Sequence, residues 1–253
     1  MTSLLKTIER IRIRLHKRYI NFVTSYPGFP CQVIDKSSFL YMYDEIFTRQ
    51  IYKFKTSREN PFIIDCGANI GLSTIYLKKL YPSAKILAFE PDPEIFSVLN
   101  KNLDSSKTKS GVTCIQACLA KEPGEVIFYS DHADGGSMAN PNKNTKAIKV
   151  SAVNLNAYLT EHVDFLKIDI EGAEYEVVMS ISDKLKNVSN VFIEYHSFAQ
   201  KEQKLDEILN ILNNAGFRYY LEPGGASSKN PFINQFVYEG MDMQVNIFGY
   251  RKN

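Results

Sequence analysis

The chain has 253 residues, 44% of them hydrophobic and 12% aromatic, so it can bury one sizeable core without needing a second. Thirty basic residues against 28 acidic ones leave a formal net charge of +2, which gives no global reason to expect nucleic acid or an anionic surface as a partner, so any basic patch must be local. Four scattered cysteines without Cys-x-x-Cys spacing indicate reduced thiols, and no apolar run is long enough to span a membrane. We therefore expect a cytoplasmic protein.

Residues 1–55 are predicted to form a helical segment ahead of the main domain. The stretch "LLKTIERIRIRLHKRYINF" places apolar residues on one helical stripe and basic residues largely off it: Leu4, Leu5, Ile8, Ile11, Leu15 and Phe22 against Lys6, Arg10, Arg14, Lys17 and Arg18. We expect this helix to lie on the domain, or on a partner subunit of a homo-oligomer, with its arginines solvated. Contact of residues 1–20 with an anionic membrane surface is the alternative. An aromatic segment, 38–55, predicts a further helix or cap.

From Pro61 the chain alternates apolar strands with amphipathic helices, which is typical of a parallel sheet covered on both faces. We expect a Rossmann-like, doubly wound α/β domain over residues 56–253 with a mostly parallel, seven-stranded sheet. The strands are predicted at 62–65, 85–89, 112–117, 165–170, 191–196, 217–221 and 245–250. No helix separates the last two, so the final pair should be antiparallel.

A hairpin-like insertion is predicted at 123–155. Two β-rich runs, 125–130 and 147–153, enclose the polar stretch 131–146, which is too rich in Gly, Asn, Ser and Pro to be regular. Loops of that length in compact domains are usually functional.

The turn after the first strand reads Gly67-Ala68-Asn69-Ile70-Gly71, and Asp65 precedes it. This spacing differs from the GxGxxG pattern of dinucleotide folds. Asn69 stands where a middle glycine would be needed, and Asn tolerates a left-handed backbone well. Because Asp65 would repel a pyrophosphate but attract an ammonium group, the turn favours the methionine portion of S-adenosylmethionine over NAD. Glu90, which ends the second strand, could accept hydrogen bonds from ribose hydroxyls of either cofactor.

Further polar residues follow two later strands: Asp169 and Glu171, then Glu194 and His196. The carboxyl ends of parallel strands meet at one crevice, so these four should converge there with Asp65 and Glu90. Methyl transfer to a hydroxyl needs alignment and removal of a proton, for which His196 or Glu171 could be the base. A divalent metal such as Mg²⁺ held by these four residues is the alternative, although nothing in the spacing requires one.

The segments "IIDCGANIGLST", "AFEPDP", "FLKIDIEGAEYEV" and "FIEYH" together resemble the FkbM-type methyltransferases. Those enzymes depend on S-adenosylmethionine and mostly methylate hydroxyls on sugars, glycolipids or macrolides. The resemblance runs from about Ser38 to the end of the chain. It implies a set of cofactor-binding residues: Asp65, Gly67, Ala68, Asn69, Gly71, Glu90, Pro91 and Asp169. It also implies that the catalytic candidates Asp169, Glu171, Glu194 and His196 lie near the transferred methyl.

The resemblance extends to "GGSMAN" in the insertion, which implies a lid or substrate contact through Gly136 and Ser137, with His196 also facing the acceptor. The chain departs from the family at Leu155-Asn156, where a Leu-Asp pair is usual. We expect an O-methyltransferase acting on a sugar, glycan, glycolipid or related secondary metabolite. The alternatives are a nicotinamide-dependent oxidoreductase and a cofactor-binding module without catalysis. Nucleic-acid methylation is disfavoured because Asn140-Pro141-Asn142 lacks a following aromatic to stack a flipped base.

Overall fold

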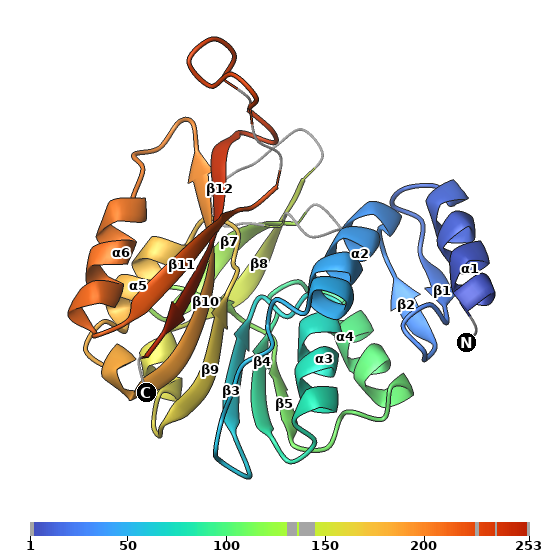
Figure 1. Ribbon diagram of the computed structural model, residues 1–253, viewed down its shortest axis with the longest axis horizontal. Coiled ribbons are helices and arrows are strands. Elements are labelled where there is room, and N and C mark those ends of the chain that lie inside the picture. The colour runs from blue at the N-terminus through green and yellow to red at the C-terminus, as the bar shows by residue number, and fades with distance from the viewer. Residues whose placement is uncertain (1–2, 131–135, 137–144, 226–227, 236, 252–253) are drawn as a thin grey trace.

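The computed structural model describes residues 3–130, 136, 145–225, 228–235 and 237–251. Its main feature is a seven-stranded sheet with the strand order β11-β12-β10-β9-β3-β4-β5 (Figure 1). The strands are β3 (Phe62–Cys66), β4 (Lys85–Phe89), β5 (Val112–Ile115), β9 (Val163–Ile168), β10 (Val188–Phe198), β11 (Arg218–Pro223) and β12 (Met241–Tyr250). The predicted Rossmann-like α/β class is confirmed.

Only β12 runs against the other strands of this sheet, since it pairs antiparallel with both β10 and β11. The pairs among β5, β4, β3, β9 and β10 are all parallel. The predicted antiparallel arrangement of the final two strands is therefore confirmed. All five of these parallel strands end at the same edge of the sheet, so their carboxyl ends lie together.

Helices cover both faces of the sheet. The helices α3 (Leu72–Leu80) and α4 (Pro93–Ser105) pack in one apolar cluster, and α5 (Glu174–Ser180) and α6 (Leu205–Asn214) pack in another. Neighbouring residues of β9 divide between the clusters, because successive side chains of a strand point to opposite faces: Phe165 to the first and Leu166 to the second. Each strand near the sheet centre is thus buried on both sides, which explains the continuous apolar runs in the sequence.

The insertion forms a small three-stranded sheet beside the main one, in the order β6-β8-β7. Strands β7 (Gly124–Ser130) and β8 (Lys146–Val153) make the predicted antiparallel hairpin. Strand β6 (Cys118–Leu119) adds to β8 in parallel, which the sequence analysis did not anticipate. Short helices η2 (Leu155–Tyr158) and η3 (Leu185–Asn187) complete the connections.

The N-terminal segment consists of α1 (Ser3–Leu15), a two-stranded sheet of β1 (Phe22–Thr24) and β2 (Cys31–Val33), α2 (Lys36–Tyr43) and the π-helix η1 (Asp44–Arg49). The small sheet was not predicted, and Phe22, which we expected on the helical stripe, lies on β1 because α1 ends at Leu15. The segment shares the apolar cluster of α3 and α4, since Phe39 and Ile46 pack there with Ile75. The boundary at residue 56 stays a prediction.

One arginine of α1 departs from our expectation that its arginines are solvated, whereas Arg12 and Arg14 are exposed as expected. Arg10 points at the body of the protein, where its guanidinium donates two hydrogen bonds to Asp44 at 2.7 and 2.5 Å and one to Tyr26 at 3.1 Å. Ile13 is the buried apolar side chain of this helix. Among the residues described, no helix is both long and apolar enough to cross a bilayer.

Asn102 on α4 joins the N-terminal segment to the glycine-bearing turn. Its side-chain oxygen accepts a hydrogen bond from Gln32 N at 2.7 Å, and its side-chain nitrogen donates to Gln32 O at 3.0 Å and Ile70 O at 2.8 Å. The side chain is 1% exposed. Because its polar atoms are all buried and paired, Asn102 fixes β2 against the turn.

We predict that Asn102→Ala lowers the free energy of unfolding by about 2–4 kcal/mol, since three hydrogen bonds are lost, two to half-buried backbone groups of Gln32 and one to the buried carbonyl of Ile70. Urea denaturation measures this change. The control is Asn213→Ala, an exposed site on α6 where the change should stay within about 0.5 kcal/mol. Equal effects at both sites would contradict the role of Asn102.

Candidate functional site

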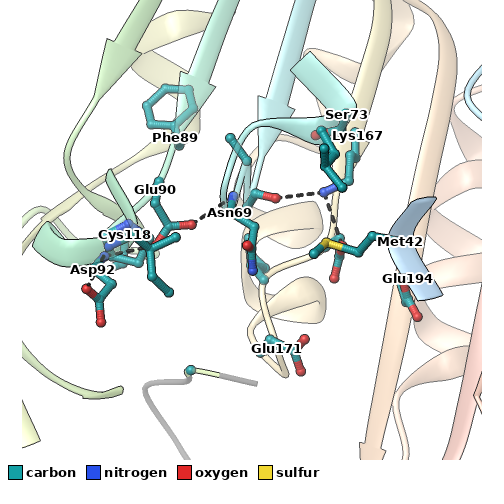
Figure 2. A pocket seen from close by; sticks show the side chains of 18 of the residues that line it. Met42, Asn69, Ser73, Phe89, Glu90, Asp92, Cys118, Lys167, Glu171 and Glu194 are labelled. Carbon is teal, nitrogen blue, oxygen red and sulfur yellow. Dashed lines mark hydrogen bonds and ion pairs between the residues drawn. The ribbon is translucent and has the colours of Figure 1, made fainter. Parts of the chain in front are cut away.

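A cavity lies at the carboxyl ends of β3, β4, β9 and β10 (Figure 2). Its empty volume, which includes the space at its open mouth, is about 1130 Å³. Its walls include predicted site residues from each of these strand ends: Gly67, Ala68, Asn69, Glu90, Pro91, Asp169, Glu171 and Glu194. The cavity therefore lies where ligands bind in open α/β sheets, outside the carboxyl ends of the strands.

The turn after β3 has the left-handed backbone that its sequence predicts. Asn69 has φ 49° and Gly67 has φ 84°. A Cβ on Gly67 would lie 1.8 Å from the carbonyl oxygen of Asp169, so only glycine fits between the ends of β3 and β9. Gly71 caps α3 and faces Leu99 behind the turn. The turn thus brings Gly67, Ala68 and Asn69 to the cavity wall and leaves Gly71 behind it.

Glu90 lies at the wall with its carboxylate fixed by backbone groups. One oxygen accepts a hydrogen bond from Asn69 N and the other from Asp92 N, both at 2.9 Å. Burial raises the pKa of Glu90 to about 8, despite these hydrogen bonds. Two oxygens held in this way keep lone pairs for further donors, such as the hydroxyls of a ribose.

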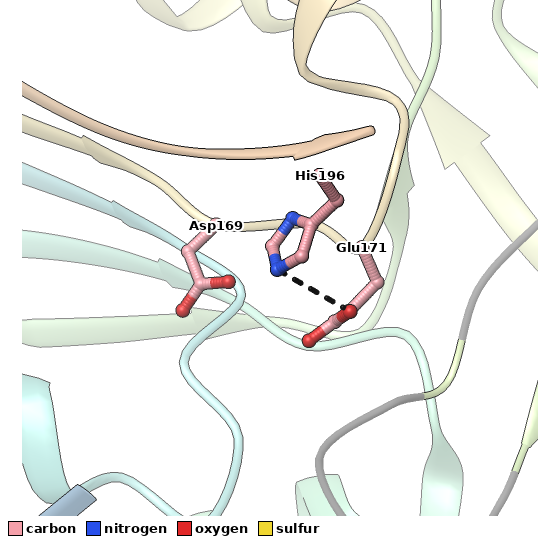
Figure 3. Close-up of side chains that lie close together, drawn as sticks. All are labelled: Asp169, Glu171 and His196. Carbon is pink, nitrogen blue, oxygen red and sulfur yellow. Dashed lines mark ion pairs between the residues drawn. The ribbon is translucent and has the colours of Figure 1, made fainter. Parts of the chain in front are cut away.

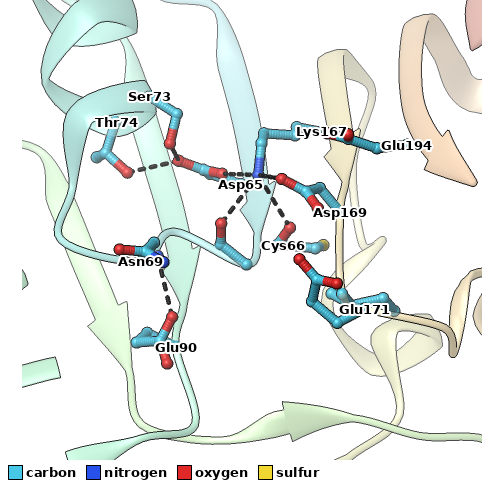
Figure 4. A network of polar contacts seen from close by, with 12 residues as sticks. Asp65, Cys66, Asn69, Ser73, Thr74, Glu90, Lys167, Asp169, Glu171 and Glu194 are labelled. Carbon is cyan, nitrogen blue, oxygen red and sulfur yellow. Dashed lines mark hydrogen bonds and ion pairs between the residues drawn. The ribbon is translucent and has the colours of Figure 1, made fainter. Parts of the chain in front are cut away.

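Asp65 lies one layer behind the wall. Its side chain is fully buried, and one of its oxygens accepts hydrogen bonds from Ser73 Oγ and Thr74 Oγ1, both at 2.6 Å (Figure 4). It does not line the cavity. Asp65 therefore fixes the first turn of α3. The direct contact between Asp65 and a ligand ammonium that we expected from the sequence is wrong, because the side chain is behind the cavity wall.

Lys167, on β9, is a site residue that the sequence analysis missed. Its ammonium group lies 3.5 Å from Asp65 Oδ1 and 3.1 Å from Asp169 Oδ2, and it donates to Gly67 O at 2.9 Å (Figure 4). Burial lowers the pKa of Lys167, but the carboxylates of Asp169 and Asp65 outweigh burial and raise the pKa above its ordinary value. The lysine stays charged and neutralises the buried Asp65 and the half-buried Asp169. A lysine inside the apolar run "FLKIDI" was the signal for it.

Three of the four predicted catalytic residues form a compact cluster, Asp169, Glu171 and His196 (Figure 3). Their ligand atoms lie within 4.8 Å of one another, a spacing that one metal ion could bridge. Lys167 Nζ already faces Asp169 at 3.1 Å, however, and this fixed positive charge would repel a divalent cation. Glu194 is outside the cluster.

His196 is buried behind the cavity wall rather than in it. Its Nδ1 lies 3.0 Å from Glu174 Oε1, and its Nε2 lies 3.5 Å from Glu171 Oε2. Burial lowers the pKa of His196, but the carboxylates of Glu171 and Glu174 outweigh burial and raise the pKa well above its ordinary value. Glu171 does line the cavity, with a left-handed backbone at φ 56°. A ligand would therefore meet Glu171 first, with His196 behind it.

Glu194 and Gln244 close the same end of the cavity. Gln244 Nε2 donates to Glu194 Oε1 at 2.7 Å and lies 3.0 Å from His196 Nε2. Burial raises the pKa of Glu194 to about 8, and the nearby Asp169 carboxylate adds to this rise. Gln244 reaches the site because β12 pairs with β10 in a register that sets it opposite His196. That register gave no signal in the sequence.

The N-terminal segment and the insertion supply the remaining walls. Tyr41, Met42 and Glu45 face the cavity from α2 and η1, and burial raises the pKa of Glu45. Phe128 and Gly136 face it from the insertion. Ser137, the other predicted substrate contact, lies outside the described residues. Four acidic residues of the cavity lining lie near one another: Asp169 shares a cluster with Glu171, and its charge contributes to the raised pKa of both Glu45 and Glu194. They form the acidic end of the cavity, and Lys167 adds a basic group to the wall.

Comparison with known proteins gives the family. Residues 65–219 match the model of the methyltransferase FkbM domain. A methyltransferase, sdnD of Sordaria araneosa, is 34% identical over 197 residues, covering 64% of this chain and 76% of the relative. The 31-O-demethyl-FK506 methyltransferase FkbM of Streptomyces tacrolimicus is 24% identical over 220 residues, covering 72% and 83%.

The fold agrees with this assignment. The crystal structure of a methyltransferase FkbM from Methylobacillus flagellatus KT superposes with a TM-score of 0.54 at 15% identity, covering 82% of this chain and 48% of the other. The family model spans well over half of the chain and includes the glycine turn, Glu90 and the cluster of Asp169, Glu171 and His196. The chain therefore belongs to the FkbM methyltransferase family and is a methyltransferase.

Proposed function

We propose that the protein transfers a methyl group from S-adenosylmethionine to a hydroxyl group of a sugar, glycan, glycolipid or related secondary metabolite. The observation that carries this proposal is the gathering of Glu45, Asp169, Glu171 and Glu194 at one end of the cavity. Acidic side chains at that end favour a ligand with a sulfonium and an ammonium group and disfavour the pyrophosphate of NAD, and a bound cation would lower the raised pKa values of Glu45 and Glu194. Membership of the family supports the same reaction class, and the name of the Streptomyces relative specifies an oxygen acceptor.

The cofactor would lie along the wall from Glu90 to Asp169. The ribose hydroxyls would donate to Glu90, whose two oxygens are already aimed by Asn69 N and Asp92 N. The turn at Gly67 lets the methionine portion approach the backbone closely, and the acidic end would receive its charged groups. The sulfonium supplies the methyl group, so the protein must align an acceptor oxygen with it.

Glu171 is the residue we assign as the proton acceptor. It lines the cavity at the acidic end, and His196 Nε2 lies 3.5 Å behind its carboxylate. When the acceptor hydroxyl forms its new bond to the methyl carbon, the bond from that carbon to sulfur breaks and the hydroxyl proton passes to Glu171. His196, held by Glu174 at 3.0 Å, acts as a positioning residue that orients Glu171. No metal is needed for these steps.

The direct test of the function is calorimetric titration with S-adenosylmethionine and, separately, NAD, followed by transfer of a radiolabelled methyl group to a panel of glycosides and hydroxylated macrolides. We expect binding of S-adenosylmethionine, no binding of NAD, and label in at least one hydroxylated acceptor. Binding of NAD alone would refute the proposal.

Binding of the cofactor at pH 7 should release about one proton from Glu90. In the free protein the pKa of about 8 leaves this group mostly protonated at pH 7. Hydrogen bonds from the ribose favour the ionised form and lower that pKa, so affinity should rise with pH up to about 8 and then level off. Calorimetry in buffers of different ionisation enthalpy measures the proton count.

Glu90→Gln should abolish the release of the Glu90 proton. It should also weaken the binding of S-adenosylmethionine at least about tenfold, because a hydrogen bond to a charged group is worth roughly 1.5–3 kcal/mol. The matched control is Glu94→Gln, at an exposed site two residues past Asp92. It should change neither the proton release nor the affinity for S-adenosylmethionine. A binding enthalpy that does not depend on the buffer would contradict the role of Glu90.

Glu171→Gln should slow methyl transfer at saturating S-adenosylmethionine about 100-fold or more, since a positioned base contributes roughly that factor. The affinity for S-adenosylmethionine should fall much less, because Glu45, Asp169 and Glu194 remain at the acidic end. His196→Gln should also lower kcat without changing cofactor affinity, and it should shift the pH profile of kcat. His162→Gln is the control, because His162 is exposed and bonds Ser189 far from the cavity. EDTA should have no effect. Loss of activity in EDTA with recovery in Mg²⁺ would refute the assignment of Glu171.

A further inference from the structure

Helix α1 carries its apolar stripe on the side that faces away from the protein. Leu4, Ile8, Ile11 and Leu15 recur at spacings of four, three and four residues, which places them on one face of the helix. They are 70%, 54%, 52% and 81% exposed. Single exposed apolar residues are ordinary, but a continuous row along a whole helix marks an interaction surface. The row is independent of the cavity and of the function proposed for it.

The opposite face of α1 is anchored to the body by polar contacts. Arg10 donates to Asp44, Lys6 Nζ donates to the Tyr43 hydroxyl at 3.4 Å, and Glu9 accepts from Thr24 Oγ1 at 2.6 Å. The polar side chains of Lys6, Glu9 and Arg10 thus hold α1 on the body of the protein, and the apolar row faces solvent. The anchoring contacts set the rotation of α1 about its axis, so the exposed row is a property of the folded protein.

Basic residues flank the exposed row. By helical spacing, Arg12 lies on one side of it and Arg14 on the other. The Arg12 side chain is 74% exposed, and Arg14 and Lys17 are exposed as well. The first 36 residues contain seven Lys and Arg against two Asp and Glu, although the whole chain is nearly neutral at +2. The basic charge of the protein is therefore concentrated around this helix.

We propose that α1 docks the protein on the surface of a bilayer that contains anionic lipids, with the helix lying in the interface. An apolar row between arginines matches that environment, because the row can enter the acyl boundary while the guanidinium groups stay among the lipid phosphates. A second copy of the chain fits less well. Pairing two such faces would bring the arginines of both copies together, and the neighbouring acids Glu9, Asp35 and Asp44 already bind groups of their own chain.

The test is co-sedimentation of the full chain with vesicles of phosphatidylcholine, alone and mixed with phosphatidylglycerol. We expect binding to the mixed vesicles that weakens as salt is added, because the attraction between surface charges is screened. Replacing both isoleucines, Ile8→Gln with Ile11→Gln, should lower vesicle affinity at least about tenfold. Replacing both arginines, Arg12→Gln with Arg14→Gln, should reduce the preference for anionic lipid by about fivefold for each arginine.

Phe232→Asn is the matched control, since Phe232 is a fully exposed apolar residue in the loop before β12. It should bind vesicles as the unaltered protein does. All these sites are exposed, so the variants should keep the thermal unfolding midpoint and the affinity for S-adenosylmethionine. Equal binding to both kinds of vesicle would overturn the proposal, and so would an equal loss in the Phe232 variant. A dimer in light scattering that the isoleucine variant dissociates would also overturn it, in favour of self-association.

Discussion

The buried ammonium group of Lys167 is the interaction on which the rest of the site depends. It lies between Asp65 and Asp169 and also binds the carbonyl oxygen of Gly67. Asp65 fixes the start of α3, Gly67 begins the turn, and Asp169 reaches the cavity. One charge thus connects the ends of β3 and β9, and it offsets the cost of burying Asp65, because an isolated carboxylate in the interior is very costly.

The site divides into a half suited to binding and a half suited to transfer. In the binding half, the two carboxyl oxygens of Glu90 each accept one backbone N–H and can accept further hydrogen bonds from a ligand. In the second, the chain of Glu171, His196 and Glu174 leads from the cavity wall into the interior. Lys167 lies between the halves, where it offsets part of the negative charge. Without that lysine the negative charges of the acidic end would repel one another, and this repulsion would raise the pKa values of its carboxyl groups further.

The sequence predicted the frame of this site better than its interior. The order of strands and helices, the left-handed Asn69 and the position of Glu90 followed from local patterns, since turns and strand ends have strong residue preferences. The direction of Asp65 did not follow, because whether a strand-end carboxylate faces a ligand or a helix depends on its neighbours in space. The place of Gln244 in the site could not be predicted for a similar reason. It lies opposite His196 because of the register of β12 on β10, which tertiary packing sets. Likewise, periodicity found the stripe of α1 but could not show which side of the helix would face the body.

The most direct test of the central claim is a crystal structure with S-adenosylhomocysteine, the product of methyl transfer. The ribose hydroxyls should lie within hydrogen-bond distance of Glu90, and the sulfur should point toward the space between Asp169 and Glu171. Lys167 should keep its contacts with Asp65 and Asp169. A ligand bound outside this cavity, or one with its adenine against Glu171 and its methionine portion against Glu90, would contradict the account.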